Sequence, residues 1–233
     1  MLISGVQKFT MLDFPEKTAC IVFTPGCNFR CGYCHNPEFV LPEEIQKLKK
    51  NFISEATFFR FLEGRQGLLD GVVITGGEPT MMGDLGEFIG KVKERDFLVK
   101  LDTNGSNPER VKPLLEKHLI DYVAMDVKTS LASYRSLVGA GGRAEKIAQS
   151  MRLFMESACQ YEFRITLVKE FHTYEMLEDL AKEIQGAKKL YLQSFRPGNT
   201  LDPLFKNYHA FSSSEMEEIR GIFSRTVAEV TIR

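Results

Sequence analysis

The sequence predicts an α/β protein, an incomplete (β/α)6 barrel with a parallel sheet and outer helices. Short apolar runs alternate with amphipathic stretches, and six β/α units follow one another along the chain. Unusual polar residues and cysteines fall at or just after the carboxyl ends of several predicted strands, where the loops of a β/α barrel converge on one active face. Six units are fewer than the usual eight, so we expect a splayed barrel whose gap leaves room for a large partner.

Each element is predicted from its own pattern. Apolar runs predict buried strands over residues 19–24, 71–75, 97–102, 122–127, 162–168 and 190–195, and a final β-like run over 227–232. Amphipathic patterns predict helices over 54–63, 84–94, 108–117, 144–157, 174–185 and 213–224. Ser54 is the expected N-cap of the first helix, and Pro108 lies in the first turn of the third. The Lys- and Glu-rich segment 38–51 is either a docking surface or a solvated loop.

Composition excludes several classes of protein. Hydrophobic residues make up 43% of the 233-residue chain and charged residues 26%, which is enough for a proper core. The net charge is −1, so there is no basic face for nucleic acid. No apolar run approaches the ~20 residues of a membrane span. The absence of a signal peptide and the odd number of cysteines predict a reducing cytoplasm.

Cys27, Cys31 and Cys34 lie within eight residues, in the run CNFRCGYC. Thiolates this closely spaced on a loop usually hold an inorganic centre. An iron–sulfur cubane normally takes four cysteines, so three would leave one iron open to an exogenous ligand. Structural zinc is one alternative, although adjacent His35 is a poor fourth ligand, and a loop without metal is another. The other two cysteines, Cys20 and Cys159, are expected to be buried and inert.

Further polar residues follow the other predicted strands. Gly76-Gly77-Glu78-Pro79 comes after the second strand and is by itself compatible with an ordinary turn. Asp102-Thr103-Asn104-Gly105 comes after the third strand, where the aspartate could simply cap the turn. Asp126 and Lys128 share one face of the fourth strand. The two histidines His118 and His172 have no constellation and are expected to be surface or helix-end residues.

Taken in order, these motifs resemble the radical S-adenosylmethionine (radical SAM) superfamily. CNFRCGYC matches its CxxxCxxC signature, with Tyr33 before the last cysteine, and Gly76–Pro79 resembles its GGEP motif. DTNG, DVK and Cys34-His35-Asn36-Pro37 are similar to motifs of the glycyl-radical-enzyme activases. The opening GVQKFTMLDFPEKTACIVFTPGCNFRCGYCHNP and the later LQSFRPGN resemble the activating proteins of anaerobic ribonucleoside-triphosphate reductase. The resemblance covers about residues 15–200.

The resemblance implies a function and a set of site residues. Cys27, Cys31 and Cys34 would hold a [4Fe–4S] cluster whose fourth iron S-adenosylmethionine chelates, and one electron would split the sulfonium to give a 5′-deoxyadenosyl radical. That radical would take a hydrogen atom from a glycine of a partner enzyme. The implied cofactor-binding residues are Tyr33, Gly76, Gly77, Glu78, Asp102, Asn104, Asp126, Lys128, Arg164 and Gln193, although Arg164 could equally be an outward salt-bridge partner. A monovalent cation at Asp102, Thr103 and Asp126 is a further expectation.

The expected partners are a glycyl radical enzyme, most simply anaerobic ribonucleotide reductase, and a low-potential flavodoxin or ferredoxin as electron donor. After Cys34 only Cys159 remains, so no auxiliary cluster is expected. We expect residues 1–233 to form a single radical SAM domain, with a cluster loop at 25–37, a partial barrel to about 200 and a C-terminal helix and strand at 201–233. Two alternatives remain open: a small-molecule radical SAM enzyme such as a 7-carboxy-7-deazaguanine synthase, and a non-catalytic iron–sulfur or metal-binding module.

Overall fold

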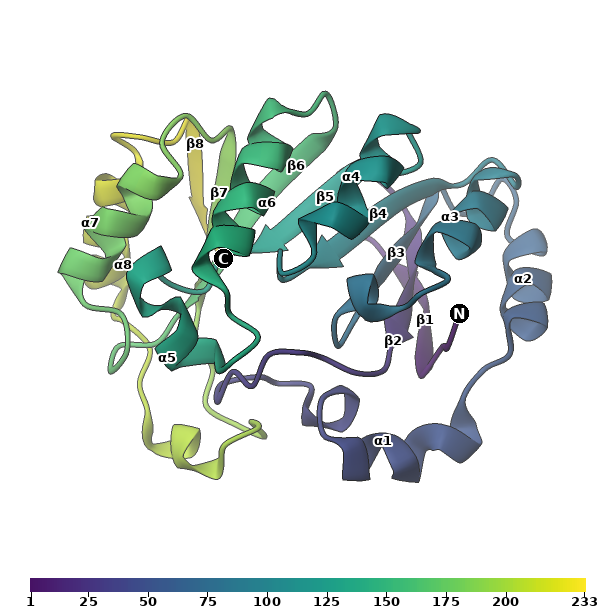
Figure 1. Cartoon of the computed structure of the whole chain (residues 1–233), viewed down its shortest axis with the longest axis horizontal. Helices are drawn as coiled ribbons and strands as arrows, with labels where there is room; N and C mark the ends of the chain where they lie inside the picture. The colour runs from purple at the N-terminus through teal and green to yellow at the C-terminus, as the bar shows by residue number, and fades with distance from the viewer. The chain divides into compact units, whose positions relative to one another are not determined.

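The structure is a computed structural model that describes all 233 residues (Figure 1). The chain forms two compact units, whose segments alternate along the sequence. The first unit comprises residues 1–28, 36–103 and 109–123, and the second comprises 29–35, 104–108 and 124–233. The expectation of a single domain over the whole chain stays a prediction.

The first unit is built on β1 (Gly5–Thr10), β2 (Ala19–Thr24), β3 (Gly71–Gly76) and β4 (Leu98–Thr103) (Figure 1). The strands are neighbours in this order; β1 is antiparallel to β2, whereas β2, β3 and β4 are parallel. Val22 lies beside Ile74, and Val73 lies beside Lys100. The strands β2 and β3 are apolar along most of their length because both faces are covered, as parallel sheets require.

Helices cover this unit on the pattern expected from the sequence. The elements are η1 (Pro37–Phe39), α1 (Pro42–Leu48), η2 (Lys49–Asn51), α2 (Glu55–Glu63), η3 (Pro79–Met81), α3 (Leu85–Lys93) and α4 (Pro108–Glu116), most of which belongs to this unit. Ser54 caps α2, because its hydroxyl accepts from the Thr57 N–H at 3.1 Å. The apolar faces of α2 and α3 meet at Phe58 and Phe88, whose ring centroids are 5.4 Å apart.

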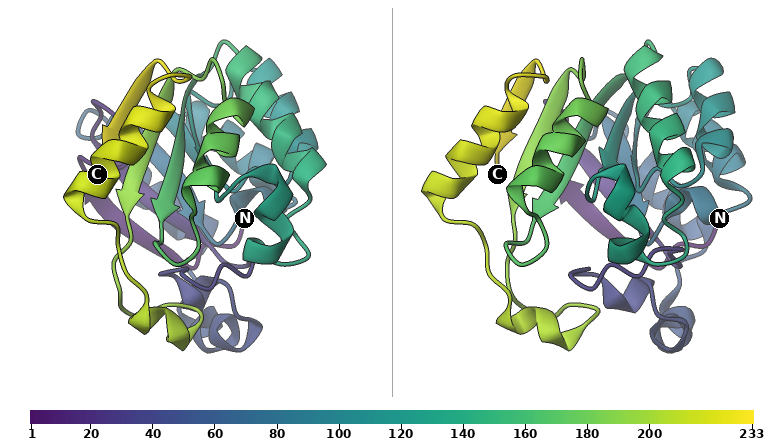
Figure 2. Two further views of the ribbon diagram at one scale, coloured as in Figure 1. Left: turned by 90° about the vertical axis from the view of Figure 1, so that its left-hand side faces the viewer. Right: turned by 60° about the vertical axis from the view of Figure 1, so that its left-hand side comes forward.

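The second unit contains the carboxyl half of β5 (Tyr122–Asp126) together with β6 (Gln160–Leu167), β7 (Lys189–Ser194) and β8 (Glu229–Ile232). β6, β7 and β8 are parallel neighbours. The helical elements are η4 (Leu131–Ser133), α5 (Tyr134–Val138), α6 (Ala144–Glu156), α7 (Tyr174–Glu183), η5 (Pro203–Asn207) and α8 (Ser213–Phe223). Figure 2 shows α7 and α8 side by side over one face of β7 and β8. A capping box between Ser212 and Glu215 starts α8.

The α/β class with parallel strands is confirmed, and every predicted strand and helix is present within a few residues of its expected bounds. The prediction missed β1, whose residues alternate poorly and are mostly exposed. It also missed the short helical elements, which are α1, α5 and η1 to η5, because each is too brief to show a helical period. No helix is both long and apolar enough to cross a membrane.

The segment 38–51, left open as a docking surface or a solvated loop, forms α1 flanked by two short 3₁₀ turns. No residue of α1 is buried, so the helix contributes little to the core of its unit. Lys47, Lys49 and Lys50 gather at its carboxyl end, where positive charge suits the helix dipole. Either role therefore remains compatible with this structure.

Candidate metal and cofactor site

In the first unit, the chain entering the cysteine loop is fastened to the Gly-Gly-Glu turn that follows β3. The Gly77 N–H donates to the Thr24 carbonyl at 2.8 Å, and the Glu78 N–H donates to the Gly26 carbonyl at 2.7 Å. The Gly26 N–H donates in turn to the carbonyl of Phe39 at 2.7 Å. Cys27 follows directly, so the approach to this cysteine is determined by three backbone hydrogen bonds rather than by side chains.

This close approach explains the two glycines. Gly76 has a φ of 117°, a left-handed conformation that disfavours any side chain, and a Cβ there would lie 2.4 Å from the Thr24 nitrogen. A Cβ on Gly77 would lie 2.0 Å from the Gly26 carbonyl oxygen. The glycines are therefore required by the neighbouring backbone of residues 24–26, whether or not a cofactor also lies against them.

Glu78 is completely buried, and its carboxylate holds the turn together. Its Oε1 accepts from the Thr80 N–H at 3.1 Å, from the Thr80 hydroxyl, and from the Thr103 hydroxyl at 2.8 Å. The Glu78 side chain thereby ties the end of β3 to the end of β4. This contact was not expected from the sequence, where Glu78 and Thr103 belong to separate motifs.

Asp102 forms an ion pair with Lys100, two residues earlier on β4. The Lys100 side chain is only 2% exposed, and its Nζ lies 5.9 Å from the centre of the Tyr122 ring. A buried lysine is unusual unless it is paired. The burial and pairing of Lys100 were not predicted from the sequence, although a lysine inside the apolar run FLVKLD is unusual enough to indicate them.

The turn after β4 passes into the second unit at Asn104. The Asn104 side-chain oxygen accepts from the Ser106 N–H at 3.0 Å, which forms an Asx turn. Gly105 has a φ of 75°, and a Cβ there would lie 2.2 Å from the Met125 methyl group. The Asn-Gly pair thus shapes this turn.

Cys31, Tyr33 and Cys34 lie in the second unit. The Cys34 N–H donates to the Cys31 carbonyl at 3.0 Å, which closes a tight turn between the two cysteines. Burial raises the pKa of the Cys31 thiol to about 11, and the positive charge of Lys128 acts in the opposite direction. The Tyr33 hydroxyl is buried without a hydrogen-bond partner. An orphaned polar atom of this kind is typical of a site that receives a ligand or water.

Asp126, Lys128 and Arg164 form one buried charge cluster at the ends of β5 and β6. The Lys128 Nζ lies 3.0 Å from Asp126 Oδ2, and the Arg164 Nε lies 2.9 Å from Asp126 Oδ1. Burial alone would raise the pKa of Asp126, but the two cations outweigh it and hold that pKa below its ordinary value. Arg164 is thus a salt-bridge partner, but its side chain is only 16% exposed and so is not fully outward-facing; a contact with the cofactor stays a prediction.

The backbone of Lys128 is held on both sides. Its N–H donates to the Tyr134 hydroxyl at 3.0 Å, and its carbonyl accepts from His172 Nε2 at 2.8 Å. The Val168 N–H donates to His172 Nδ1 at 3.0 Å, with the Val168 carbonyl 3.1 Å from the same nitrogen, and the contact of Nε2 with a carbonyl fits a neutral imidazole protonated on Nε2. Burial lowers the pKa of His172, which favours this neutral form.

The expectation that His172 is a surface residue is wrong, since it is 1% exposed, although it does lie at a helix end, directly before the Thr173 N-cap of α7. His118 is exposed, as expected.

Cys20 is fully buried as expected, and burial raises its pKa to about 12. Cys159 is only half-buried, because it precedes β6 rather than lying within it. Gln193 lies near the end of β7, and its side-chain oxygen accepts from the Thr166 hydroxyl at 3.4 Å.

The residues present fit an iron–sulfur centre in their chemistry. Soft thiolates with a nearby cation are suited to iron or zinc. In this structure no group of three or more His, Cys, Asp or Glu side chains is gathered closely enough to hold a metal ion. Cys27 belongs to the first unit and Cys31 and Cys34 to the second, so the convergence of the three thiolates on one cluster stays a prediction.

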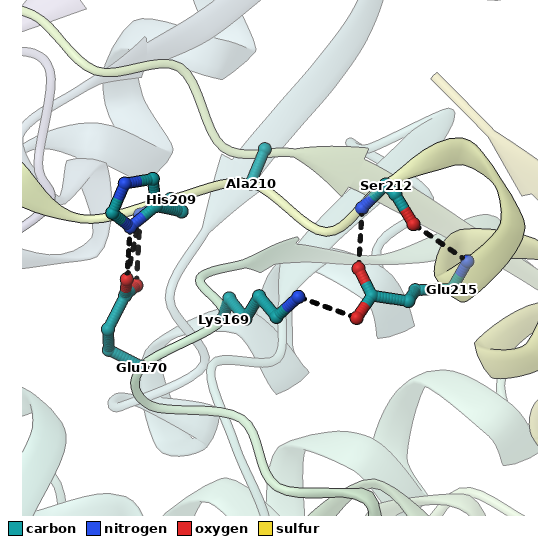
Figure 3. A pocket seen from close by; sticks show the side chains of 6 residues that line it. All are labelled: Lys169, Glu170, His209, Ala210, Ser212 and Glu215. Atoms are coloured by element: carbon teal, nitrogen blue, oxygen red, sulfur yellow. Dashed lines mark hydrogen bonds and ion pairs between the residues drawn. The ribbon is translucent and has the colours of Figure 1, made fainter.

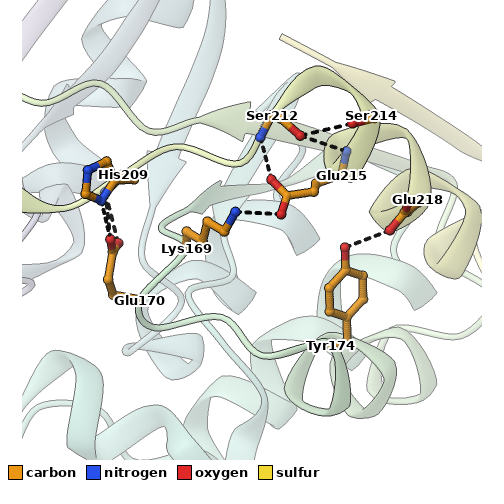
Figure 4. Close-up of polar contacts among 8 residues, drawn as sticks. All are labelled: Lys169, Glu170, Tyr174, His209, Ser212, Ser214, Glu215 and Glu218. Carbon is orange, nitrogen blue, oxygen red and sulfur yellow. Dashed lines mark hydrogen bonds and ion pairs between the residues drawn. The ribbon is translucent and has the colours of Figure 1, made fainter.

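A pocket elsewhere in the second unit is lined mainly by charged side chains (Figure 3). It is lined by Lys169, Glu170, His209, Ala210, Ser212 and Glu215. Lys169 pairs with Glu215 and Glu170 with His209, both at 2.6 Å, and Figure 4 adds the hydrogen bond from Tyr174 to Glu218 at 2.9 Å. The charges of the pocket are thus paired with one another, and none of the predicted site residues lies there. Its contacts fasten the segment before α8 to the end of β6.

Comparison with known sequences assigns the family. The profile of the Radical SAM superfamily matches residues 21–184, which cover the cysteine loop, the Gly-Gly-Glu turn and the strands that carry the other motifs. The chain therefore belongs to the radical SAM superfamily, whose members use a [4Fe–4S] cluster and S-adenosylmethionine. Membership favours the cluster over the zinc alternative for the three cysteines.

Individual relatives indicate narrower possibilities. A protein of Methanocaldococcus jannaschii, named as a candidate glycyl-radical enzyme activating enzyme, is 32% identical over 237 residues, covering 100% of this chain and 95% of its own length. A 7-carboxy-7-deazaguanine synthase of Methanopyrus kandleri is 29% identical over 199 residues, covering 76% of this chain and 73% of its own. Among solved structures, Streptococcus suis SuiB bound to precursor peptide SuiA matches with a TM-score of 0.63 at 16% identity, which shows the fold alone. The match covers 91% of this chain but only 47% of that longer one.

Proposed function

We propose that this protein is a glycyl-radical-enzyme activase. It would cleave S-adenosylmethionine reductively and abstract a hydrogen atom from a glycine of a partner enzyme, most simply anaerobic ribonucleoside-triphosphate reductase. The observation that carries the proposal is the similarity over the full chain to a relative named for this activity. The absence of cysteines for a second cluster also fits, because the activase reaction as implied by the resemblance needs one cluster only.

The second unit supports the cofactor part of the proposal. When bound, the cluster supplies one electron to the sulfonium of S-adenosylmethionine. Lys128 would neutralise the methionine carboxylate, and Asp126, itself paired with Arg164, would hold the ammonium group of Lys128 in place. The buried environment strengthens such a contact, because few water molecules compete for the charges.

The first unit would contribute Cys27 and the turn at Gly76, Gly77 and Glu78. The Glu78 carboxylate oxygen Oε1 already accepts three hydrogen bonds, so we assign the methionine ammonium to the backbone of this turn rather than to that oxygen. Asp102, Asn104 and Gln193 would face the nucleoside, where a carboxylate can accept from ribose hydroxyls. Asp102, Thr103 and Asp126 remain the proposed monovalent-cation ligands, and Tyr33 lies beside the adenosine end in this assignment.

The test is hydrogen transfer under anaerobic conditions. The reconstituted and reduced protein is mixed with S-adenosylmethionine and the anaerobic ribonucleotide reductase of the same genome, carrying α-deuterated glycine. We expect deuterium in 5′-deoxyadenosine and a glycyl-radical doublet in the electron paramagnetic resonance spectrum of the reductase. Cofactor cleavage without either signal would contradict the activase assignment.

A 7-carboxy-7-deazaguanine synthase is the second candidate, favoured by the similarity to the Methanopyrus kandleri enzyme. The same assay separates the two, because a small-molecule enzyme would take hydrogen from its small substrate and leave the labelled polypeptide unchanged. A non-catalytic iron–sulfur module would yield neither methionine nor 5′-deoxyadenosine. A flavodoxin or ferredoxin would supply the electron, and α1 is a candidate docking surface for that donor or for the partner.

A further inference from the structure

A segment after β7 returns to the cysteine loop and is joined to it by its backbone. We call residues 200–205 the clasp. The Leu201 N–H donates to the Cys34 carbonyl at 3.0 Å, and the Asp202 N–H donates to the Gly32 carbonyl at 2.9 Å. Two consecutive N–H groups of the clasp thus donate to carbonyls of residues 32–34.

A side-chain contact closes the same junction. Phe205 is 4% exposed, and its ring covers the Cα of Gly32 so closely that a Cβ there would lie 2.2 Å from a ring carbon. The Tyr33 ring centroid is 6.0 Å away on one side, and the Phe171 ring is stacked at 5.3 Å on another. The absence of a side chain at Gly32 is thus required by Phe205.

The clasp is itself held at both ends. The Asp202 carboxylate accepts from the Leu204 N–H at 2.9 Å, which caps η5 and sets the direction of Phe205. Beyond η5, the Lys169 N–H donates to the His209 carbonyl at 3.0 Å, and Glu170 pairs with the His209 ring (Figure 4). These contacts restrict the clasp independently of the cysteine loop, so the entropy cost of holding the two segments together is reduced.

We infer that the clasp positions the cysteine loop, and that Gly32 and Phe205 are positioning residues for Cys31 and Cys34. This rests on the proposed function only in so far as the three cysteines hold the cluster. Groups that orient metal ligands from outside the first coordination shell typically change metal affinity by about 10- to 100-fold when they are replaced. The carbonyls of Gly32 and Cys34 are held by the clasp, and they belong to the same tight turn as both thiols.

The first test measures how fast the anaerobically reconstituted protein loses its cluster in an excess of chelator. The loss is monitored by absorbance. Phe205→Ala and, separately, Gly32→Ala should speed bleaching by about tenfold. Leu204→Ala is the matched control, since Leu204 lies in the same short helix but is 61% exposed. The control should bleach at the wild-type rate. If Phe205→Ala lowers the melting temperature while the bleaching rate stays at the wild-type value, Phe205 is only a core residue and the inference is wrong.

The second test asks whether the two residues act through one contact. If they do, the double variant Gly32→Ala/Phe205→Ala should bleach no faster than the worse single variant, because the alanine methyl group at 32 then has no ring to strike. Additive effects would show that Gly32 acts independently of Phe205 and would overturn the inference. Phe205→Leu keeps most of the apolar volume, and it replaces Phe205→Ala if that variant does not fold.

A third measurement does not involve the cluster. In metal-free protein, the alkylation rate of Cys31 and Cys34 by iodoacetamide should rise in Phe205→Ala and stay constant in Leu204→Ala, with Cys159 as an internal reference. Unchanged alkylation of both cysteines would contradict the positioning role. Failure of glycine hydrogen transfer with the chelator and alkylation effects intact would refute the proposed function alone.

Discussion

At the scale of single residues, Lys128 is held at three points within the second unit's charge cluster. Its ammonium group pairs with Asp126 at 3.0 Å, its N–H is bound by Tyr134, and its carbonyl is bound by His172. Asp126 and the electrostatic attraction of Cys31 raise the pKa of Lys128 despite burial, so the side chain stays charged over the whole physiological range. A charge this well anchored is suited to orienting an anionic group.

Replacement of Lys128 with Ala should weaken S-adenosylmethionine binding by at least about tenfold, because removing one member of a buried charge pair costs about 2 to 5 kcal/mol. Iron content should remain near the wild-type value, since no thiolate is lost. Equilibrium binding and iron analysis measure the two quantities. Lys169→Ala is the control, because Lys169 also pairs with a carboxylate but is half exposed. A fall in iron equal to that of a Cys31→Ala variant would contradict this role of Lys128.

His172 predicts a dependence of stability on pH. Its pKa is lowered below the ordinary 6.5 in the folded protein, so the unfolded chain binds the proton more tightly. The neutral ring therefore contributes stability above about pH 6.5, and this contribution is lost as the pH falls. The free energy of unfolding should decrease more steeply from about pH 7 to about pH 5 in the wild type than in His172→Gln.

Urea denaturation at several pH values measures this difference. His118→Asn serves as the control, because His118 is exposed and has a φ of 53°, which asparagine tolerates. The control should follow the wild-type pH dependence. Parallel pH profiles for wild type and His172→Gln would show that the buried ring does not titrate on unfolding as argued.

At the scale of elements, the turn after β3 and the start of the cysteine loop form one backbone assembly. Gly77→Ala would place a methyl group 2.0 Å from the Gly26 carbonyl oxygen, a backbone atom that cannot rotate away. We expect a loss of about 1 to 3 kcal/mol in stability and a fall in cluster content, because Cys27 follows Gly26 directly.

Gly83→Ala is the matched control for this prediction, since a Cβ at Gly83 meets no atom within 4 Å. Thermal unfolding and iron content should both stay near the wild-type values in the control. A Gly77→Ala protein with wild-type iron and an unchanged melting temperature would mean that the turn can shift without disturbing the loop.

At the scale of the whole molecule, the strands of the first unit make an apolar core that contains none of the three cysteines of the predicted cluster. The first unit packs Phe14, Ala19, Ile21, Val73 and Tyr122 into one apolar cluster. Removal of the cluster by a chelator should therefore leave the far-ultraviolet circular dichroism nearly unchanged. The melting temperature should fall only by the amount that ligand binding contributes through mass action. Loss of the helical signal on chelation would show that folding depends on the metal, as it does in small zinc domains.

The sequence was most informative where a signal is local. Apolar runs predicted β2 to β8 because a parallel strand covered on both faces is continuously hydrophobic. The ordered motifs pointed to the radical SAM superfamily that the profile match establishes, whereas the ligand set implied by the cysteine spacing stays a prediction. The burial of Lys100 and the burial of His172 were not predicted, because a single polar residue in a sequence does not reveal which distant group faces it.

The amino-acid sequence by itself determined the class of fold, the family, and which residue types are available for the chemistry, since these depend on periodicity and on short spacings along the chain. Only the tertiary structure decided which distant residues meet: Lys128 with His172, Glu78 with Thr103, and Gly32 with Phe205. The physical reason is that such contacts form when separate elements pack, and packing selects partners by shape and hydrogen bonding over separations that no local pattern records.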